Sequence, residues 1–449
     1  MASFGSIKYR FLYIRRNRLA PLALLLAAVA AVVSYPENDA IAKTRPKNLV
    51  RTQKHHAAPK VRIASKTPPP AVTFEPDSVS ETAVPPTPVR LLSRDEILAS
   101  DAGRLERAGR HLIVGFHKFA EITRLVEKRA IAGIFITDHN VQQRSIAAIK
   151  SDIDALQTIR AEQGMPPLII AADQEGGTVS RLSPPLARQI SLGRLLAGME
   201  HDGERRKAVE DYAETQASEL KRIGVTLNFA PVVDLKLNPL NRDDGETRLR
   251  LRAIAADPYL VAKVAEWYCD KVATAGLMCT LKHFPGLGRV AKDTHVATGE
   301  INASEGQLEL NDWVPFRRVM ARPNVAMMLG HVRVSAIDKQ TPASFSSPLI
   351  HDLIRDHWSY DGLLVTDDFS MGAVTGSKGG IGAAAVKSLN AGADLILVSF
   401  VEKHYDVVMS ALLAADAGDA MDREITGASR ERIGRIVRAA AHPQEGTAN

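Results

Sequence analysis

Side chains that can exchange protons near neutral pH stand close together in the triplet Asp293-Thr294-His295. An aspartate two residues before a histidine can accept a hydrogen bond from its Nδ1–H, which fixes the tautomer and leaves the other nitrogen for proton transfer. The same spacing also occurs in surface loops that have no catalytic role. Taken alone, the triplet therefore leaves both interpretations open.

Two adjacent carboxylates, Asp367 and Asp368, end an apolar stretch at residues 362–368. We expect one of them to point into a site, while its neighbour points away or caps the following helix. Two adjacent carboxylates could instead bind a divalent cation, but no histidine or glutamate lies beside them at ligand spacing. We therefore expect neither a metal nor a cofactor.

Polar residues suited to ligand binding follow two other apolar stretches. Asp173 is followed closely by two glycines, which permit a tight turn and a close approach of the backbone to a ligand. Its carboxylate can accept hydrogen bonds from two hydroxyl groups, and Arg181 is near enough in sequence to reach the same place. Lys282 and His283 precede a turn rich in proline and glycine.

These residues belong to a series of short apolar runs separated by segments of helix length. Strands that alternate with helices indicate βαβ units and a parallel sheet. Eight such units within about 350 residues fit a closed (β/α)8 barrel of the TIM type, in the α/β class. A doubly wound open sheet is the alternative, but no Gly-x-Gly-x-x-Gly follows an early strand. The eight runs are residues 111–116, 132–137, 167–173, 225–234, 278–284, 325–332, 362–368 and 395–400.

Charged groups or imidazoles stand at the C-terminal ends of five of the eight runs. In a barrel these ends surround one mouth, where active sites lie. A single aspartate after a strand is more often a helix N-cap, but capping does not easily explain five strand ends. The pattern therefore favours the barrel and predicts a site at its mouth. The residues are Asp173, Asp234, Lys282 with His283, His331, and Asp367 with Asp368.

Over about residues 110–400 the chain resembles the β-N-acetylhexosaminidases of glycoside hydrolase family 3, the single-domain type that trims peptidoglycan fragments. In that family the KHFPG…D-x-H block distinguishes N-acetylglucosaminidases from β-glucosidases, which use a glutamate from a second domain; we expect no second domain here. The resemblance rests on DQEGG…R at 173–181, NFAPVVDL at 228–235, KHFPGxG…DTH at 282–295, GHV at 330–332, PASFS at 342–346, DGLLVTDDFSM at 361–371 and AGADLILV at 391–398.

The resemblance implies a retaining exo-β-N-acetylglucosaminidase. Asp367 would be the nucleophile, since it directly follows Thr366. His295 would be the acid/base and Asp293 its orienting partner, while Asp368 would have a supporting role. The loop at residues 286–294 contains two glycines and is expected to move, so that His295 would lie out of reach in an empty site.

The resemblance also implies a set of sugar-binding residues. One family arginine lies five residues before an Asp-Pro pair, which here gives Arg252, although Arg248 and Arg250 in a longer connection leave that assignment open. Leu287 stands where the family usually has a second histidine. The expected sugar-binding residues are Asp173, Arg181, Arg252, Lys282, His283 and His331.

Two other functions remain open at this point. One is a β-glucosidase or β-xylosidase of the same fold. The other is a cell-wall-binding protein whose site has decayed, although the intact Asp367, Asp293 and His295 oppose it. The expected partner is a small carbohydrate containing N-acetylglucosamine, either a glycan or a muropeptide; the oligomeric state is left open.

The N-terminal residues have the pattern of a targeting segment. Five basic residues precede an apolar run at residues 19–33, which suits a signal peptide or a membrane anchor over residues 1–42. Residues 43–93 are rich in proline and basic residues and are expected to form a linker, followed by the catalytic domain at 94–441. We expect export to the periplasm, or a tether on the outer face of the cytoplasmic membrane.

The charge of the chain is unevenly distributed. Residues 1–66 contain thirteen lysines and arginines against two acidic residues, so they carry +11 and the remainder carries −5 of the net +6. A nucleic-acid-binding domain is therefore not expected. The two cysteines, Cys269 and Cys279, are expected as small core residues, although a single bridge is possible in an oxidising compartment.

Overall fold

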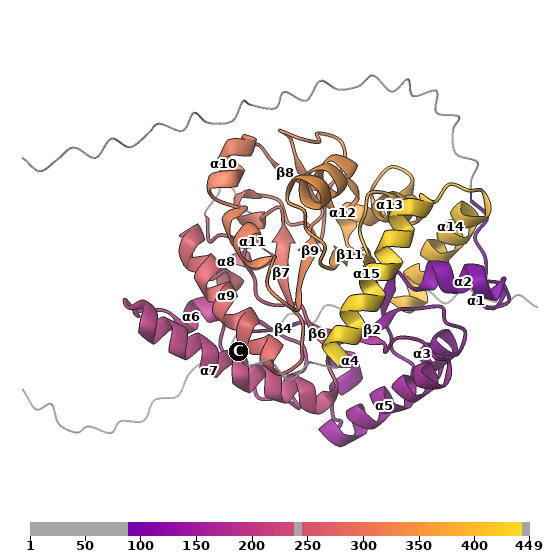
Figure 1. Ribbon diagram of the computed structural model, residues 1–449, viewed down its shortest axis with the longest axis horizontal. Coiled ribbons are helices and arrows are strands. Elements are labelled where there is room, and N and C mark those ends of the chain that lie inside the picture. Colours follow the sequence, from indigo (N-terminus) through magenta and orange to yellow (C-terminus); the bar gives the residue numbers. More distant parts are fainter. Residues whose placement is uncertain (1–88, 238–244, 442–449) are drawn as a thin grey trace, which may run out of the picture. The chain divides into compact units, whose positions relative to one another are not determined.

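Eight parallel strands form a closed barrel in the computed structural model, which describes residues 89–237 and 245–441. The strands follow the order β6-β3-β2-β1-β12-β11-β9-β7. The N–H of Met278 donates to the carbonyl of Thr226 over 2.9 Å and thereby joins the two ends of the sheet. The predicted (β/α)8 barrel is therefore confirmed, with a strand in each predicted run (Figure 1). The strands are β1 (Leu112–Gly115), β2 (Gly133–Ile136), β3 (Ile169–Ala172), β6 (Leu227–Asn228), β7 (Cys279–Phe284), β9 (Val325–Leu329), β11 (Leu364–Asp368) and β12 (Leu395–Val398).

Alternate residues of each strand enter two different cores. Ile113, Phe135 and Met328 belong to the cluster inside the barrel, whereas Leu112 and Ile134 pack against the surrounding helices. Both faces of the sheet are therefore buried, which is why the strands read in sequence as continuous apolar runs.

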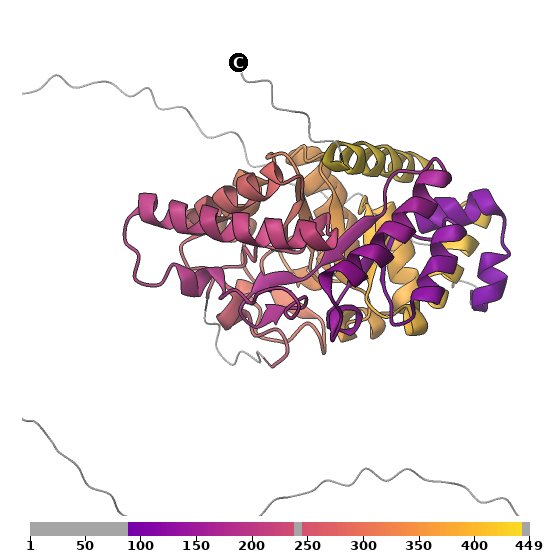
Figure 2. The same ribbon diagram turned by 90° about the horizontal axis from the view of Figure 1, so that it is seen from below.

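Helices surround the barrel, and α3, α5, α7, α9 and α11 pack side by side in that order (Figures 1 and 2). The α-helices are α1 (Arg94–Leu98), α2 (Ala102–Gly109), α3 (Phe119–Glu127), α4 (Asp138–Val141), α5 (Ile146–Glu162), α6 (Leu192–Leu195), α7 (Asp202–Ile223), α8 (Leu249–Arg252), α9 (Pro258–Thr274), α10 (Glu305–Leu310), α11 (Val314–Val319), α12 (Gly372–Thr375), α13 (Gly380–Asn390), α14 (Asp406–Ala417) and α15 (Arg423–Ala441). In addition there are the 3-10 helices η1 (Leu287–Arg289) and η2 (Ala343–Phe345) and the π-helices η3 (Pro348–His357) and η4 (Val401–Tyr405).

Short strands outside the barrel belong to the connections that follow its strands. They form two pairs, β4 (Gln174–Gly176) with β5 (Val179–Ser180), and β8 (Gly299–Ile301) with β10 (Val332–Val334). The last helix, α15, has a different role, since its Ile433 and Val437 belong to the apolar cluster inside the barrel. It therefore covers the barrel at the end opposite to these connections.

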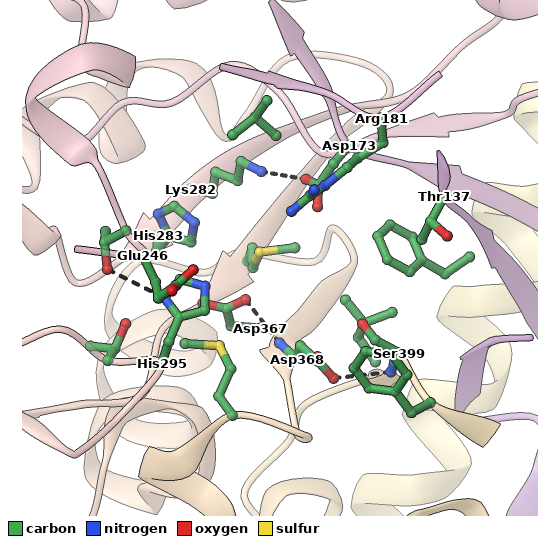
Figure 3. Close-up of a pocket in the computed structure, with 18 of the residues that line it drawn as sticks. Thr137, Asp173, Arg181, Glu246, Lys282, His283, His295, Asp367, Asp368 and Ser399 are labelled. Atoms are coloured by element: carbon green, nitrogen blue, oxygen red, sulfur yellow. Dashed lines mark hydrogen bonds and ion pairs between the residues drawn. The ribbon is translucent and has the colours of Figure 1, made fainter. Parts of the chain in front are cut away.

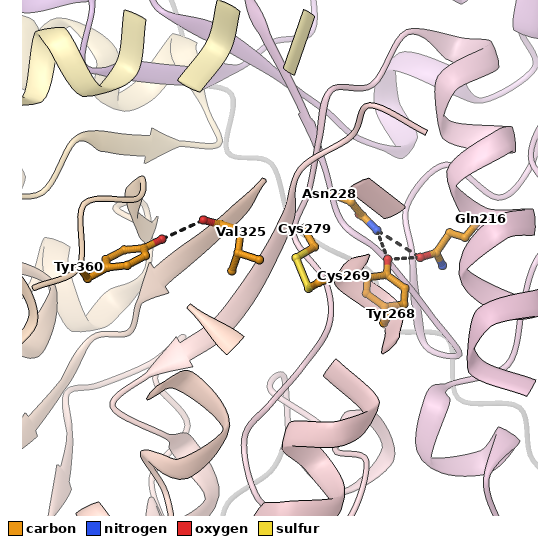
Figure 4. The surroundings of a disulfide bond; sticks show 7 residues. All are labelled: Gln216, Asn228, Tyr268, Cys269, Cys279, Val325 and Tyr360. Atoms are coloured by element: carbon orange, nitrogen blue, oxygen red, sulfur yellow. Dashed lines mark hydrogen bonds between the residues drawn. A yellow bond between two sulfur atoms is a disulfide. The ribbon is translucent and has the colours of Figure 1, made fainter. Parts of the chain in front are cut away.

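A disulfide bond joins Cys269 in α9 to Cys279 at the start of β7, with 5.5 Å between their Cα atoms (Figure 4). Both residues are buried, as expected, but they are bonded rather than two separate small core residues. Close by, the hydroxyl of Tyr268 accepts a hydrogen bond of 3.0 Å from the side chain of Asn228. The bond links a helix directly to the strand that carries Lys282 and His283.

The expected leader (residues 1–42) and most of the expected linker lie outside the described residues. Of the described helices, none has both the length and the apolar character needed to cross a membrane. The described helices and strands run from α1, which begins at Arg94, to α15, which ends at Ala441.

Candidate active site

A cavity of about 370 Å³ lies at the C-terminal ends of the barrel strands (Figure 3). Its walls come from segments that follow at least six of the strands, so distant parts of the sequence meet there. Seven of the nine predicted site residues line it: Asp173, Arg181, Arg252, Lys282, His283, His295 and Asp367.

Asp367 lies at the end of β11 and faces the cavity (Figure 3). Burial alone would raise the pKa of its carboxyl group. The imidazoles of His283, His331 and His295 outweigh burial and hold this pKa below its ordinary value. The carboxylate therefore stays ionised near neutral pH, as a nucleophile must.

The side chain of the neighbouring Asp368 binds backbone N–H groups. Its carboxylate accepts hydrogen bonds from the N–H groups of Ser370 and Ser399, each over 3.0 Å. Burial raises the pKa of this carboxyl group. Asp367 is thus available for chemistry, whereas Asp368 fixes the loops after β11 and β12. Asp368 also lines the cavity, so it does not point away from the site as the sequence suggested.

Asp293 orients the imidazole of His295 by a hydrogen bond of 2.9 Å to Nδ1. The same carboxylate accepts from the Thr247 hydroxyl at 2.7 Å and from the N–H groups of Thr247 and Glu246. Burial raises its pKa, but these hydrogen bonds outweigh burial and keep the pKa well below the ordinary value. Since Nδ1 is engaged, Nε2 of His295 is the nitrogen available to the cavity.

The loop that carries His295 is docked on α12, the helix that follows Asp367. The N–H of Gly372, the first residue of α12, donates to the carbonyl of His295 over 2.8 Å. A Cβ atom at position 372 would lie 2.4 Å from the carbonyl oxygen of Val296, so this contact requires glycine. His295 lines the cavity, so the expectation that it lies out of reach in an empty site is wrong for this structure.

A buried network of charges lines another wall of the cavity. The ammonium of Lys282 lies 2.6 Å from both Asp173 and Glu175, and the guanidinium of Arg252 binds both carboxylate oxygens of Glu175, at 2.8 and 2.6 Å. Burial raises the pKa of Glu175, but Arg252 and Lys282 outweigh it and lower the pKa to about 2. Burial lowers the pKa of Lys282, whereas the two carboxylates raise it above its ordinary value.

Two arginines complete this wall. Arg252, the last residue of α8, lines the cavity, whereas Arg248 and Arg250 are absent from its lining within the described residues. Arg181 is exposed at the rim, and its backbone N–H donates to the carbonyl of Asp173 over 3.0 Å. Figure 3 shows its guanidinium beside the carboxylate of Asp173. Both arginines therefore lie where the sequence predicted.

The imidazole of His283 is held by Asp234, which is fully buried. Asp234 lies 2.7 Å from Nδ1 of His283 and also accepts a hydrogen bond from the N–H of Leu287 over 2.6 Å. Leu287 is itself buried and lines the cavity. The replacement of the family's second histidine therefore lies at the site and gives it an apolar surface.

His331 differs from its predicted place. It is completely buried and does not line the cavity; its Nδ1 lies 2.8 Å from the Ser344 hydroxyl and its Nε2 3.0 Å from the carbonyl of Asp368. Because both nitrogens are engaged, His331 can support the end of β11 but does not contact a ligand.

Three further contributors were not predicted as site residues. Glu175 belongs to a quoted motif, but nothing in its spacing showed that it would join Lys282 and Arg252. Thr247 and Glu246 lie in the long connection after β6, and they are brought to Asp293 by the fold alone. Hydrogen-bonding partners of this kind have no sequence signature.

An ionised aspartate and a histidine oriented by a carboxylate, at the mouth of a (β/α)8 barrel, are groups with which a glycoside hydrolase can work. The profile of the glycosyl hydrolase family 3 N terminal domain matches residues 105–436, and the chain belongs to this family. The resemblance found in the sequence is therefore confirmed.

Curated relatives carry the name beta-hexosaminidase. The protein of Idiomarina loihiensis is 32% identical over 286 residues, covering 64% of this chain and 82% of the relative. That of Xylella fastidiosa strain M23 is 36% identical over 289 residues, covering 64% and 80%.

Solved structures of the same family have a similar fold. A beta-N-acetylglucosaminidase from Paenibacillus sp. str. FPU-7 has a TM-score of 0.69 at 29% identity, covering 77% of this chain and 64% of the Paenibacillus chain. A family member from Mycobacterium smegmatis has a TM-score of 0.65 at 29% identity, covering 76% and 98%.

Proposed function

We propose that the protein is a retaining exo-β-N-acetylglucosaminidase that removes terminal β-linked N-acetyl-D-hexosamine from peptidoglycan fragments. The observation that carries this proposal is the pair formed by the ionised Asp367 and the Asp293-oriented His295 in one cavity. The names of the curated relatives and of the Paenibacillus structure support the hexosaminide specificity.

In the first step the carboxylate of Asp367 attacks the anomeric carbon, and the bond to the leaving oxygen breaks. His295, protonated at Nε2, gives its proton to that oxygen, and a covalent glycosyl-enzyme remains. In the second step the now neutral His295 takes a proton from water. The water oxygen attacks the anomeric carbon and releases Asp367 as a carboxylate.

Most retaining glycosidases use two carboxylates for these roles. A histidine differs because its basic form is neutral and does not repel the carboxylate of Asp367 when both face the same sugar. Asp293 then stabilises the imidazolium that forms after His295 has taken a proton, since its own pKa is far too low for it to become protonated itself.

The charged wall is suited to the hydroxyl groups of the sugar. Asp173 accepts hydrogen bonds from hydroxyls, while Lys282 and Arg181 donate to them. Glu175 does not need to touch the sugar, because its two oxygens already bind Arg252 and Lys282. Its contribution is to hold these two cations at the cavity wall.

We also propose that the protein works outside the cytoplasm, in the periplasm or tethered to the outer face of the cytoplasmic membrane. Two observations support this location: the targeting pattern of residues 1–42 and the buried disulfide, because such bonds persist in oxidising compartments. Peptidoglycan fragments are available there.

The proposed activity is tested with 4-nitrophenyl N-acetyl-β-D-glucosaminide and its glucoside and xyloside counterparts. We expect turnover of the first substrate and much slower release from the other two. NMR of the first product should show the β-anomer, because two displacements restore the configuration. Faster turnover of the glucoside or xyloside would mean that the protein is a β-glucosidase or β-xylosidase. If the α-anomer is the first product detected, the enzyme does not retain the anomeric configuration.

Asp367→Asn should reduce kcat by several orders of magnitude while the thermal midpoint stays close to that of the parent protein. The exposed carboxylate Asp352, on η3 and outside the cavity, supplies the matched control Asp352→Asn. Normal turnover by Asp367→Asn would show that the nucleophile is another residue.

A further inference from the structure

A second cavity lies at the opposite end of the barrel from the active site. It has a volume of about 530 Å³ and is lined by Ala132 and Ile169, which stand at the starts of β2 and β3. Its remaining walls come from α2 and the residue after it, from α5 and the connection at residues 164–167, and from α15, including Ile433 and Val437. We call it the floor cavity.

The floor cavity carries an excess of positive charge. Its ionisable lining residues are four arginines and two glutamates, which gives a net charge of +2. Within the described ranges, neither Arg430 nor Arg438 has a carboxylate at ion-pair distance, whereas Arg110 is paired with Glu106. The four arginines are Arg110, Arg160, Arg430 and Arg438, and the two glutamates are Glu106 and Glu431.

Arg160 is the most unusual member of this set, because only 4% of its surface is exposed. Its Nε donates to the carbonyl of Pro166 over 3.3 Å, but its Nη1 is buried and has no acceptor among the described residues. Burial lowers the pKa of its guanidinium to about 10, and the charge of Glu106 only partly opposes this effect.

A buried guanidinium without a counter-ion is unfavourable, because the desolvation of its charge is not compensated. If Arg160 only filled space, an uncharged side chain of similar size could replace it without a loss of stability. A ligand that brings negative charge into the floor cavity would provide the missing partner for Arg160 and would also neutralise the net +2.

We propose that the floor cavity binds a phosphate-bearing small molecule. A phosphate dianion matches the net charge of the lining, and its oxygens suit the forked donors of the exposed Arg430, while the guanidinium of Arg160 adds its charge to the same cavity. The apolar walls at Ile433 and Val437 accommodate a compact organic part of the same molecule. The bound phosphate would connect α5 with α15 and thereby fasten the last helix to the barrel.

Binding is measured with inorganic phosphate, by calorimetry and by the thermal midpoint, against chloride at equal ionic strength. Saturating phosphate should raise the midpoint by about 5 °C at a hundredfold excess over the dissociation constant. Arg160→Met, which keeps a long side chain and removes the charge, should abolish this shift. Arg430→Ala, at the more exposed α15, should weaken phosphate binding at least about tenfold.

Arg206→Ala is the matched control, since Arg206 is an exposed arginine of α7 that does not line the floor cavity. It should leave the phosphate shift unchanged. If Arg160→Met fails to fold, Arg430→Ala decides the outcome by itself. Neither readout depends on glycosidase activity, so a failure of phosphate binding can be distinguished from a failure of the proposed glycosidase function.

The phosphate group could belong to a soluble metabolite or to a lipid headgroup. Co-sedimentation with phosphatidylcholine vesicles, with and without phosphatidic acid, distinguishes these sources. Binding of free phosphate without vesicle binding indicates a soluble ligand, whereas Arg430-dependent binding to the anionic vesicles indicates a headgroup. The proposal is wrong if neither probe binds, or if both bind Arg430→Ala as tightly as the parent protein.

Discussion

In the proposed mechanism His295 acts as an acid, because its other ring nitrogen is fixed by Asp293 and its peptide segment is docked on α12. The importance of proton donation depends on the leaving group. An alkoxide of a sugar needs the proton, whereas a dinitrophenolate leaves readily without it.

His295→Ala should therefore lower kcat/KM for chitobiose by about 100- to 10,000-fold and affect 2,4-dinitrophenyl N-acetyl-β-D-glucosaminide much less in the glycosylation step. Single-turnover kinetics on both substrates measures the difference. Equal losses on the two substrates would speak against an acid role. The half-buried His351, which does not line the cavity, supplies the control variant His351→Ala, which should leave both rates unchanged.

Glu175 has a folded-state pKa of about 2, compared with 4.5 when unperturbed. Because the folded value is depressed, its ionisation stabilises the protein fully above about pH 4.5, and this stabilisation is lost as pH falls toward 2. Glu175→Gln should cost about 3–5 kcal/mol at pH 7, since it leaves Lys282 and Arg252 buried without their shared partner.

Urea denaturation at pH 7 and pH 3 tests this expectation. The difference in unfolding free energy between Glu175→Gln and the parent should be smaller at pH 3, where part of the parent's stabilisation has already been lost. An equal difference at both pH values would mean that the charge of Glu175 contributes little.

The residue types at the site could be read from the sequence more readily than their partners. Asp173, Lys282 and Asp367 stand at strand ends, and a barrel brings strand ends together. His331 also follows a strand, yet it is turned into the protein, because a strand end does not fix the direction of a side chain. Glu175 and Thr247 act through contacts that only the folded chain creates.

At the scale of elements, the short α12 supports the catalytic loop. Its first residue accepts the close approach of the loop backbone because it has no side chain. The eight barrel strands were predictable, since strands buried on both faces are continuous apolar runs. The docking of a loop on a helix was not, because it depends on a single N–H group and on space for a carbonyl oxygen.

Gly372→Ala should displace the segment that carries His295. We expect kcat on chitobiose to fall by about tenfold or more, with a smaller loss on the dinitrophenyl substrate, because the acid is misplaced rather than removed. Gly306→Ala is the control, since a Cβ at this α10 position meets nothing within 4 Å. Unchanged kcat in Gly372→Ala would show that the loop has another stable position.

At the scale of the whole molecule, the disulfide makes the stability of the fold depend on the redox conditions around it. The sequence left the state of Cys269 and Cys279 open, because ten residues of separation do not show whether two cysteines approach each other. The bond restricts the unfolded chain, and closing a loop of this size contributes about 2–3 kcal/mol to stability.

Reduction of this bond should lower the thermal midpoint by about 4–6 °C. Scanning calorimetry with and without dithiothreitol measures the shift, and the double variant Cys269→Ser/Cys279→Ser should be insensitive to the reductant. An identical midpoint in both conditions would mean that the bond adds nothing to the stability of the barrel.

The last helix has a consequence for biosynthesis. Because Ile433 and Val437 of α15 cover one end of the barrel, the apolar interior is sealed only after the chain has been made at least as far as Val437. A chain that stops before α15 would leave apolar side chains at this end of the barrel exposed to chaperones and proteases. The interior of the barrel is therefore protected from proteases only once α15 has docked.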